Sequence, residues 1–351
     1  MKNSNHNDIY IAWDIGGAYT KYAIEQNSQV RCYVQKCELW KNFFELKDLI
    51  SRILKKFKNK KIINLITMSG EMCDIFENRE IGVKKIINHF KSLKSTSYIF
   101  TKNKLFFDIK SNNFSVNNIA SMNWIATSNF LANRVENCIG IDIGSTTTDI
   151  ILIKNNKIIN RRINDFTGLI NHELLYSGIL RTPIYALTHE IKYRNKKYKI
   201  IPENFANMSD IYRLLAYLKP AYDYSSTSDN RSKSNINNMK RLSRIFGFDY
   251  HSTKKDLLFM LSKKIFTIHM DHISSNIKYH LQQKYVKTKD LKIVGIGIGK
   301  FLIRLICKKN NWRYIDFNEY CTHKTVGIYQ PSDIAPAYSL IPLLSNYEKN
   351  T

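Results

Sequence analysis

The chain lacks any apolar run near the ~18 residues that a membrane-spanning helix needs, and residues 1–8 lack the apolar core of a signal peptide. We therefore expect a cytoplasmic protein without a membrane partner. Its 351 residues, 44% of them hydrophobic, are enough for a sizeable core and predict about two domains.

Paired cysteine motifs are also absent. Six cysteines are scattered along the sequence, and none forms a C-x-x-C pair. Zinc sites and disulfide frameworks usually show such regular spacing. The sequence therefore favours free, buried thiols in a reduced protein.

Acidic residues are scarce, with 29 Asp and Glu against 54 Lys and Arg, so the formal net charge is +25. Such an excess can attract nucleic acid. The lysines, however, are spread along the chain, and the run at 55–61 falls on the solvated side of an expected amphipathic helix. We expect mostly incidental charge and no nucleic acid partner, with a functional basic surface as the alternative.

One phrase occurs twice. Asp14-Ile15-Gly16-Gly17 and Asp142-Ile143-Gly144-Ser145 each follow an apolar strand and precede a second apolar strand. Repetition in matching register is a signal of duplicated structure. The sequence therefore predicts two similar hairpins.

Both turns combine glycine with hydroxyl side chains, which is the chemistry of a phosphate site. Glycine lets consecutive N–H groups approach an anion, and hydroxyls add donors. A carboxylate beside a phosphate needs a cation between them, and Mg²⁺ prefers carboxylate, water and phosphate oxygens. We therefore predict that Asp14, Asp142 and Asp149 hold Mg²⁺, partly through water. The alternative is an ordinary strand-to-turn exit.

The candidate phosphate-binding residues of the two hairpins are Gly16, Gly17, Lys21, Gly144, Ser145, Thr146 and Thr147. A third cluster, Gly295, Gly297 and Gly299, ends a short apolar strand before an apolar helical stretch. Alone this spacing is a weak signal, because it lacks the dinucleotide-binding pattern. Its order after the two hairpins gives it weight.

This order of elements resembles the sugar kinase, Hsp70 and actin superfamily. Within it, the chain from about 10 to 344 resembles the hydantoinase/oxoprolinase-related family, and in particular its tetrahydromethanopterin-linked C1-transfer group. The stretches that carry the resemblance are 38–40, 67–71, 121–124, 142–149, 176–178, 181–183 and 208–214.

The resemblance implies an α/β protein with the two-lobed actin-like ATPase (ribonuclease H-like) fold and duplicated phosphate-binding hairpins that face one another across a cleft. Residues 1–135 would form the first lobe. Residues 136–351 would form the second, with a helical insertion and the glycine turn 295–299.

The implied function is a transferase of methanofuran-type C1-carrier biosynthesis. It would join a furan-methyl diphosphate to the phenol of a (glutamyl)tyramine through an ether bond and release pyrophosphate. Asp14 and Asp142 would neutralise the diphosphate through Mg²⁺. Lys21 and Arg181 would add positive charge, and Glu71 would accept the phenol proton. An ATP-dependent hydantoinase/oxoprolinase-like hydrolase or kinase and a non-catalytic nucleotide-dependent scaffold are the alternatives, so ATP as a cofactor stays open.

Several polar groups have two interpretations. Glu71 is either a base or a helix-start carboxylate, and Arg181 and Arg213 are either anion ligands or structural ion-pair partners. The polar stretch 222–238 is a surface loop or a lid over the site. For His269 and His272, helical spacing permits a metal site, but with no further ligand we favour a helix surface.

Overall fold

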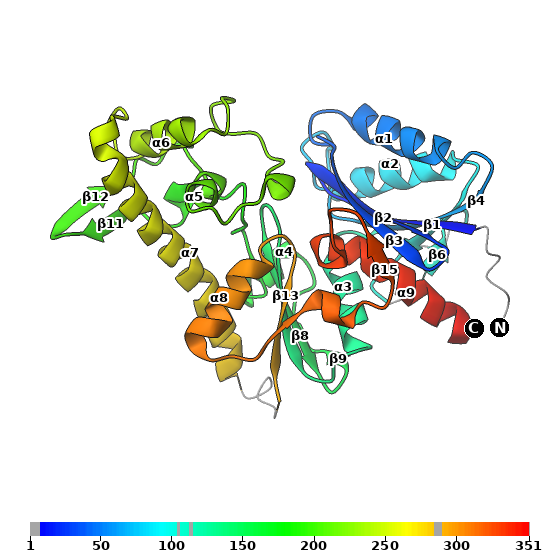
Figure 1. Ribbon diagram of the computed structural model, residues 1–351. Coiled ribbons are helices and arrows are strands. Elements are labelled where there is room, and N and C mark those ends of the chain that lie inside the picture. Colours follow the sequence, from blue (N-terminus) through cyan, green and yellow to red (C-terminus); the bar gives the residue numbers. More distant parts are fainter. Residues whose placement is uncertain (1–7, 104–105, 112–114, 284–289, 351) are drawn as a thin grey trace. The chain divides into compact units, whose positions relative to one another are not determined.

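The computed structural model describes residues 8–103, 106–111, 115–283 and 290–350, and the chain divides into two compact units (Figure 1). Unit 1 comprises 1–137, 153–159 and 316–351, and unit 2 comprises 138–152 and 160–315. The expected second lobe, 136–351, therefore differs from unit 2 at its C-terminal end. The reason is α9 (Ala335–Asn350), which packs on the sheet of unit 1.

Unit 1 is built on a sheet with the strand order β15-β3-β2-β1-β4-β5-β6. Strands β1, β2 and β3 are antiparallel, and β4 and β5 continue parallel to β1. The strands are β1 (Asp8–Ile15), β2 (Tyr19–Gln26), β3 (Gln29–Lys36), β4 (Lys61–Met68), β5 (Thr96–Phe100), β6 (Phe106–Asp108) and β15 (Lys324–Val326).

The central strand β1 is buried on both faces. Its alternate residues Ile9, Ile11, Trp13 and Ile15 belong to one core cluster with the apolar sides of α1 (Phe43–Lys55) and α2 (Arg79–Lys91), which lie together in Figure 1. Side chains of a strand alternate between the two faces of its sheet. Asp14 therefore points to the other face, away from this cluster.

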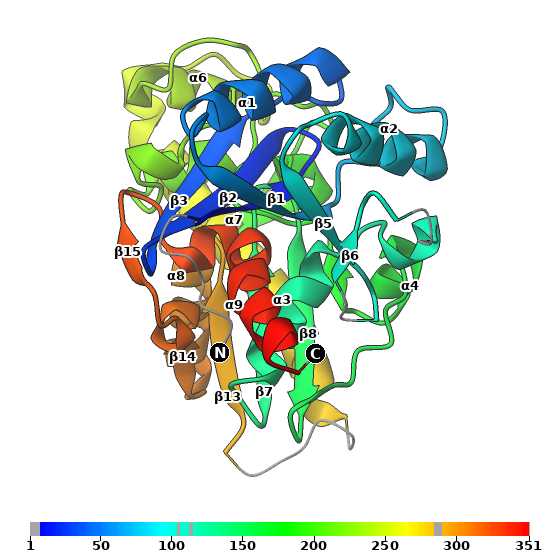
Figure 2. The ribbon, with the colours of Figure 1, turned by 90° about the vertical axis from the view of Figure 1, so that its right-hand side faces the viewer.

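Helices cover that other face too. α9 contacts β1, β2 and β4, and it packs along α3 (Asn123–Ala132), as Figure 2 shows. These two helices come from segments that are far apart in the sequence. Strand β1, which carries Asp14 near its C-terminal end, is therefore covered by helices on both faces.

Unit 2 repeats the arrangement with the order β10-β8-β7-β13-β14. β7 and β8 are neighbours joined by the turn 144–147, and β13 runs parallel to β7. The predicted α/β fold with two similar hairpins is confirmed. The strands of this sheet are β7 (Cys138–Ile143), β8 (Thr148–Lys154), β9 (Lys157–Ile158), which pairs with the end of β8, β10 (Leu174–Leu175), β13 (Lys292–Ile296) and β14 (Tyr314–Asp316).

A largely helical part of unit 2 follows β10. A two-stranded hairpin, β11 (Glu190–Tyr193) with β12 (Lys196–Lys199), occupies the basic stretch of the sequence. The helices of unit 2 are α4 (Asp165–Ile170), α5 (Met208–Leu214), α6 (Asn235–Arg244), α7 (Lys255–Gln282) and α8 (Lys300–Asn310).

Short 3₁₀ turns connect these elements, at Val116–Asn118, Ile184–Ala186, Pro220–Tyr222, Ser252–Lys254, Phe317–Tyr320 and Pro331–Ile334. All six cysteines are free, as expected. Among the described residues, no helix is long and apolar enough to cross a membrane.

Candidate functional site

The first hairpin places three polar side chains together at the end of β1. Asp14 pairs in register with Lys21 on β2 and with Thr67 on β4. Directly paired residues point to the same face of a sheet. Asp14 is 5% exposed and Thr67 is fully buried. Lys21 is therefore on the same face as Asp14, where the sequence predicted a positive charge.

The turn after Asp14 is held closely by the chain that follows β4. Both Ser69 and Gly70 donate backbone hydrogen bonds to the carbonyl oxygen of Ile15, at 3.0 and 2.9 Å. A Cβ on Gly70 would lie 2.9 Å from the carbonyl carbon of Gly16, and a Cβ on Gly17 would lie 2.7 Å from the sulfur of Cys73. These glycines are required by close packing, which keeps the turn narrow.

Glu71 follows this brace and is fully buried. Its Oε1 accepts a 2.7 Å hydrogen bond from the hydroxyl of Ser121 and lies 3.8 Å from Nε of Arg79. Two stretches of the resemblance, 67–71 and 121–124, therefore meet inside unit 1. The helix-start interpretation of Glu71 does not hold, because α2 begins at Arg79 with Asn78 as its cap.

The second hairpin has a turn closed on itself by a 2.9 Å hydrogen bond from the N–H of Gly144 to the carbonyl oxygen of Thr147. Ser145, Thr146 and Thr147 are half-buried, and the hydroxyls of Ser145 and Thr146 are 3.4 Å apart. The turn therefore gathers backbone amides and hydroxyl groups at the end of β7, which suits an anion.

The segment 177–182 braces this turn. The N–H groups of Ile179, Leu180 and Arg181 donate to the carbonyl oxygens of Gly144 and Ser145 at 2.9–3.0 Å. A Cβ on Gly178 would lie 2.6 Å from the backbone of Ser145 and Thr146. No structural role of this segment could be predicted from the sequence; in the structure it packs against the second turn as Ser69 and Gly70 pack against the first.

Arg181 is attached to the turn through its backbone, and its side chain is exposed. Its position beside Ser145 agrees with a role in binding an anion. Arg213, the other uncertain arginine, binds both carboxylate oxygens of Asp223 at 2.7 and 2.8 Å. Arg213 is thus a structural ion-pair partner.

The third glycine cluster lies against the second hairpin. Gly297 has a φ of +78°, and a Cβ there would stand 2.4 Å from both Oδ1 of Asp142 and the carbonyl oxygen of Ile143. Gly299 donates to that carbonyl at 3.0 Å and caps α8. The positive end of the α8 dipole and the end of β7 before the turn 144–147 therefore lie together within unit 2.

Gly295, the first glycine of the cluster, has a different role. A Cβ there would lie 2.6 Å from the ring of Tyr314. This glycine makes room for the packing of β14 against β13 rather than for a ligand.

Asp149 forms an ion pair with Arg162, which also binds Asp165 at 2.9 Å. Arg162 is 8% exposed, so Asp149 is engaged in a nearly buried pair. Among the described residues, no group of three or more His, Cys, Asp and Glu side chains is arranged to hold a metal ion. A metal set that includes Asp149 does not agree with this geometry.

His269 corrects the sequence-based interpretation of a helix surface, because it is fully buried. Its Nδ1 is 2.7 Å from the hydroxyl of Tyr212, and its Nε2 is 2.8 Å from the hydroxyl of Ser177. Burial lowers the pKa of His269 to about 3, so the ring is neutral. The hydroxyl of Thr148 donates to the carbonyl of Ser177, which joins this chain of contacts to the second hairpin.

The polar stretch 222–238, which the sequence left as a surface loop or a lid, is fastened by ion pairs. Arg241 is fully buried and binds Asp210 at 2.8 Å and Asp229 at 3.0 Å. Lys233 binds Asp223 at 3.1 Å. Burial raises the pKa of Asp210, and the two arginines beside it oppose that shift. Asp229 and Lys233 hold the loop in place.

The model of the hydantoinase/oxoprolinase family matches residues 64–328. Two relatives carry the name (4-{4-[2-(gamma-L-glutamylamino)ethyl]phenoxymethyl}furan-2-yl)methanamine synthase. The protein from Methanocaldococcus jannaschii is 29% identical over 286 residues, which cover 81% of this chain and 84% of the relative. The protein from Methanococcus vannielii is 32% identical over 221 residues, which cover 62% of this chain and 95% of the relative.

A solved structure, the activator of the 2-hydroxyisocaproyl-CoA dehydratase from Clostridium difficile with bound ADPNP, is similar over 97% of both chains. Its TM-score is 0.41 and its sequence identity is 10%.

Proposed function

The chain belongs to the hydantoinase/oxoprolinase family, and from this premise we propose that it is an enzyme that forms an aryl ether for a methanofuran-type carrier. The compound in the name of both relatives contains a furan methylene joined through oxygen to a phenyl ring, which bears a gamma-glutamylaminoethyl chain. Its substrates would be a furan-methyl diphosphate and gamma-glutamyltyramine. The observation that carries this proposal is the phosphate-type turn in unit 2 in a chain related to these synthases.

We assign the diphosphate to the second hairpin. The turn 144–147, the capped start of α8 and the guanidinium of Arg181 all offer donors or positive potential to an anion. Asp14, Lys21 and the turn at Gly16 and Gly17 are the proposed second phosphate-binding element.

At either hairpin, Mg²⁺ fits as a cation held by one carboxylate, with waters and phosphate oxygens as its other ligands. Asp142 stands at the turn 144–147, and Asp14 stands at the matching position of the first hairpin. When bound, Mg²⁺ would neutralise negative charge on the leaving diphosphate. Asp149 is not included, because Arg162 engages it.

In the proposed reaction, the bond between the furan methylene carbon and the diphosphate oxygen breaks, and a bond from that carbon to the phenol oxygen forms. The phenol proton leaves with the pyrophosphate, whose oxygens are basic enough to accept it at the moment of displacement. The residues of the turn stabilise the negative charge that develops on the leaving group.

Glu71 fits a positioning role better than that of a base. It is fully buried, and its carboxylate binds Ser121 and faces Arg79. We propose that this pair of contacts fixes the segment 69–71 against the first turn, so that a loss of Glu71 loosens the turn near Gly16.

The test is a reaction without nucleotide. The protein is incubated with Mg²⁺, an (aminomethyl)furan-methyl diphosphate and gamma-glutamyltyramine, and ether product and pyrophosphate are measured by mass spectrometry and a coupled assay. Equal amounts of both products without ATP support the proposal. Strict dependence on ATP, with ADP and phosphate as products, would favour the ATP-dependent hydrolase or kinase instead.

A further inference from the structure

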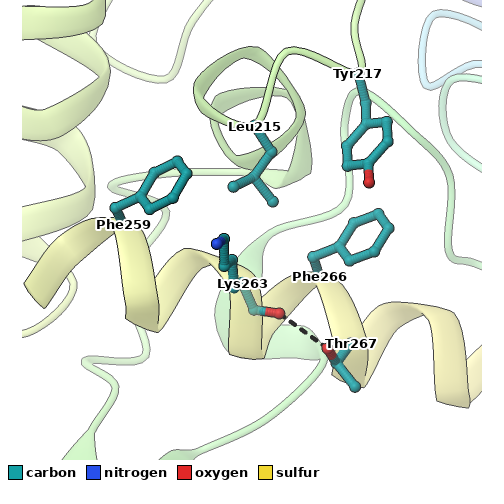
Figure 3. A pocket seen from close by; sticks show the side chains of 6 residues that line it. All are labelled: Leu215, Tyr217, Phe259, Lys263, Phe266 and Thr267. Atoms are coloured by element: carbon teal, nitrogen blue, oxygen red, sulfur yellow. Dashed lines mark hydrogen bonds between the residues drawn. The ribbon is translucent and has the colours of Figure 1, made fainter. Parts of the chain in front are cut away.

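A cavity of about 320 Å³ lies in unit 2 between α7 and the chain after α5. Phe259, Lys263, Phe266 and Thr267 line it from α7, and Figure 3 shows Phe259 and Phe266 projecting on either side of Lys263. Leu215 and Tyr217 form the opposite wall. The α7 residues are spaced i, i+4, i+7 and i+8, so they share one helix face.

The walls are mostly aromatic and partly open. Tyr217 is 40% exposed. Its ring is nearly parallel to that of Phe266, with centroids 4.9 Å apart, and to that of Phe301, with centroids 5.6 Å apart. A flat ring that stacks on such a group gains contact energy beyond its buried area. The cavity therefore suits an aryl ligand.

One positive charge stands among these rings. The Nζ of Lys263 lies 4.6 Å from the ring centroid of Phe259. In the part of the chain that the structure describes, no acidic side chain forms an ion pair with Lys263. A single ammonium beside aromatic walls is complementary to an aryl group whose flexible tail ends in one carboxylate.

Elements that pack against the cavity walls also contact the second hairpin. Phe301, which stacks on Tyr217, is the second residue of α8, and Gly299, which caps α8, donates to Ile143 of the hairpin. Tyr212 packs edge-on against both Phe266 and Phe301. Its hydroxyl is hydrogen-bonded to His269, whose other ring nitrogen is hydrogen-bonded to Ser177. The cavity floor and the phosphate-type turn are thus parts of one packed framework.

We infer that this cavity binds the phenolic acceptor, with the ring of gamma-glutamyltyramine against Tyr217 and Phe266 and its α-carboxylate at Lys263. The inference rests on the proposed function. The furan substrate brings two phosphates, which we assign to the second hairpin. The acceptor has no phosphate, so its affinity must come from its ring and its amino-acid end, and this cavity offers partners for both.

The test is equilibrium binding by titration calorimetry, followed by KM in the ether-forming assay. Lys263→Ala should weaken the binding of gamma-glutamyltyramine roughly fivefold and leave tyramine, which has no carboxylate, unchanged. Tyr217→Leu should weaken the binding of both gamma-glutamyltyramine and tyramine. Lys264→Ala is the matched control, because Lys264 is the next residue of α7 and faces the basic hairpin β11–β12 instead.

The outcomes separate the two proposals. If ether forms but neither the KM nor the affinity for gamma-glutamyltyramine responds to Lys263→Ala and Tyr217→Leu, the cavity assignment is wrong and the proposed function stands. If the binding pattern is as expected but no ether forms, the cavity assignment is supported and the proposed reaction is wrong. The assignment would also be wrong if the protein bound ATP and not gamma-glutamyltyramine, and if the two variants weakened the binding of ATP. Thermal melting of each variant shows whether it is folded.

Discussion

Gly178 lies so close to Ser145 that a Cβ on it would stand 2.6 Å from the carbonyl carbon of that residue. Gly70 has the same relationship to Gly16 in the first unit, at 2.9 Å. Each turn is therefore packed closely against a glycine from a later segment, whose neighbouring N–H groups donate to the turn or to the strand before it. This relationship makes the glycine itself testable, because backbone atoms cannot move aside as a flexible side chain can.

Gly178→Ala should lower the free energy of unfolding by about 1 to 3 kcal/mol, since an overpacked site must shift its neighbours. It should also weaken pyrophosphate binding, because the neighbours that shift are the turn itself. Urea unfolding and calorimetry measure the two effects. Gly144→Ala is the stability control on the same turn, because its Cβ would meet only the Thr147 carbonyl oxygen at an ordinary 3.6 Å. Equal stability of the two variants would contradict the bracing role.

The two aspartates of the second hairpin should behave differently. Asp142→Asn should reduce Mg²⁺-dependent turnover by about a hundredfold or more, because it removes a negative charge that the proposed mechanism uses to hold the cation. The amide has nearly the same shape as the carboxylate, so the loss of stability should be small. Activity across a Mg²⁺ titration and a urea melt measure this. Unchanged turnover would remove Asp142 from the proposed mechanism.

Asp149→Asn should instead destabilise the fold by about 2 to 4 kcal/mol, because it leaves the nearly buried Arg162 without one of its two carboxylates. The Mg²⁺ concentration that gives half-maximal activity should not change. A large shift of that concentration, with stability intact, would restore Asp149 as a metal ligand.

His269 predicts a pH dependence of stability. Its pKa is about 3 in the folded protein and about 6.5 in an unfolded chain. Below pH 6.5 the unfolded state binds a proton that the folded state excludes. The free energy of unfolding therefore decreases as the pH is lowered, by about 1.4 kcal/mol per pH unit. His269→Gln should reduce the slope between pH 6 and 4 by about that amount. The exposed His251→Gln is the control, and equal slopes in both variants would refute the buried neutral ring.

Arg241→Met should cost about 3 to 5 kcal/mol, because it removes one of the two arginines that compensate the charge of the fully buried Asp210. Amide exchange should rise across 222–238, since Asp229 loses its 3.0 Å partner. Arg231→Ala in the same loop is the control, because its side chain is exposed. Slow exchange in both variants would mean that the loop is held by other contacts.

Local patterns in the sequence determined the two hairpins, the glycine turn at 295–299 and most regular elements. Alternating apolar residues that end in Asp-Ile-Gly define a strand and its turn within about ten residues, and α1 follows from its apolar spacing. The strand β5 (Thr96–Phe100) has no such local pattern, and its pairing with β4 defines it as a strand. The family resemblance located 67–71, 121–124 and 176–183 without explaining what they do.

Only the tertiary structure decided the partners of the polar residues. Helical spacing identified His269 but not Tyr212, 57 residues earlier, which makes its burial possible. The sequence likewise shows Asp149 beside a turn and cannot show that Arg162 reaches it. A buried charge or ring nitrogen is stable only beside a partner of opposite character. Because that partner comes from a distant segment, its identity depends on how the segments pack, and no local pattern contains it.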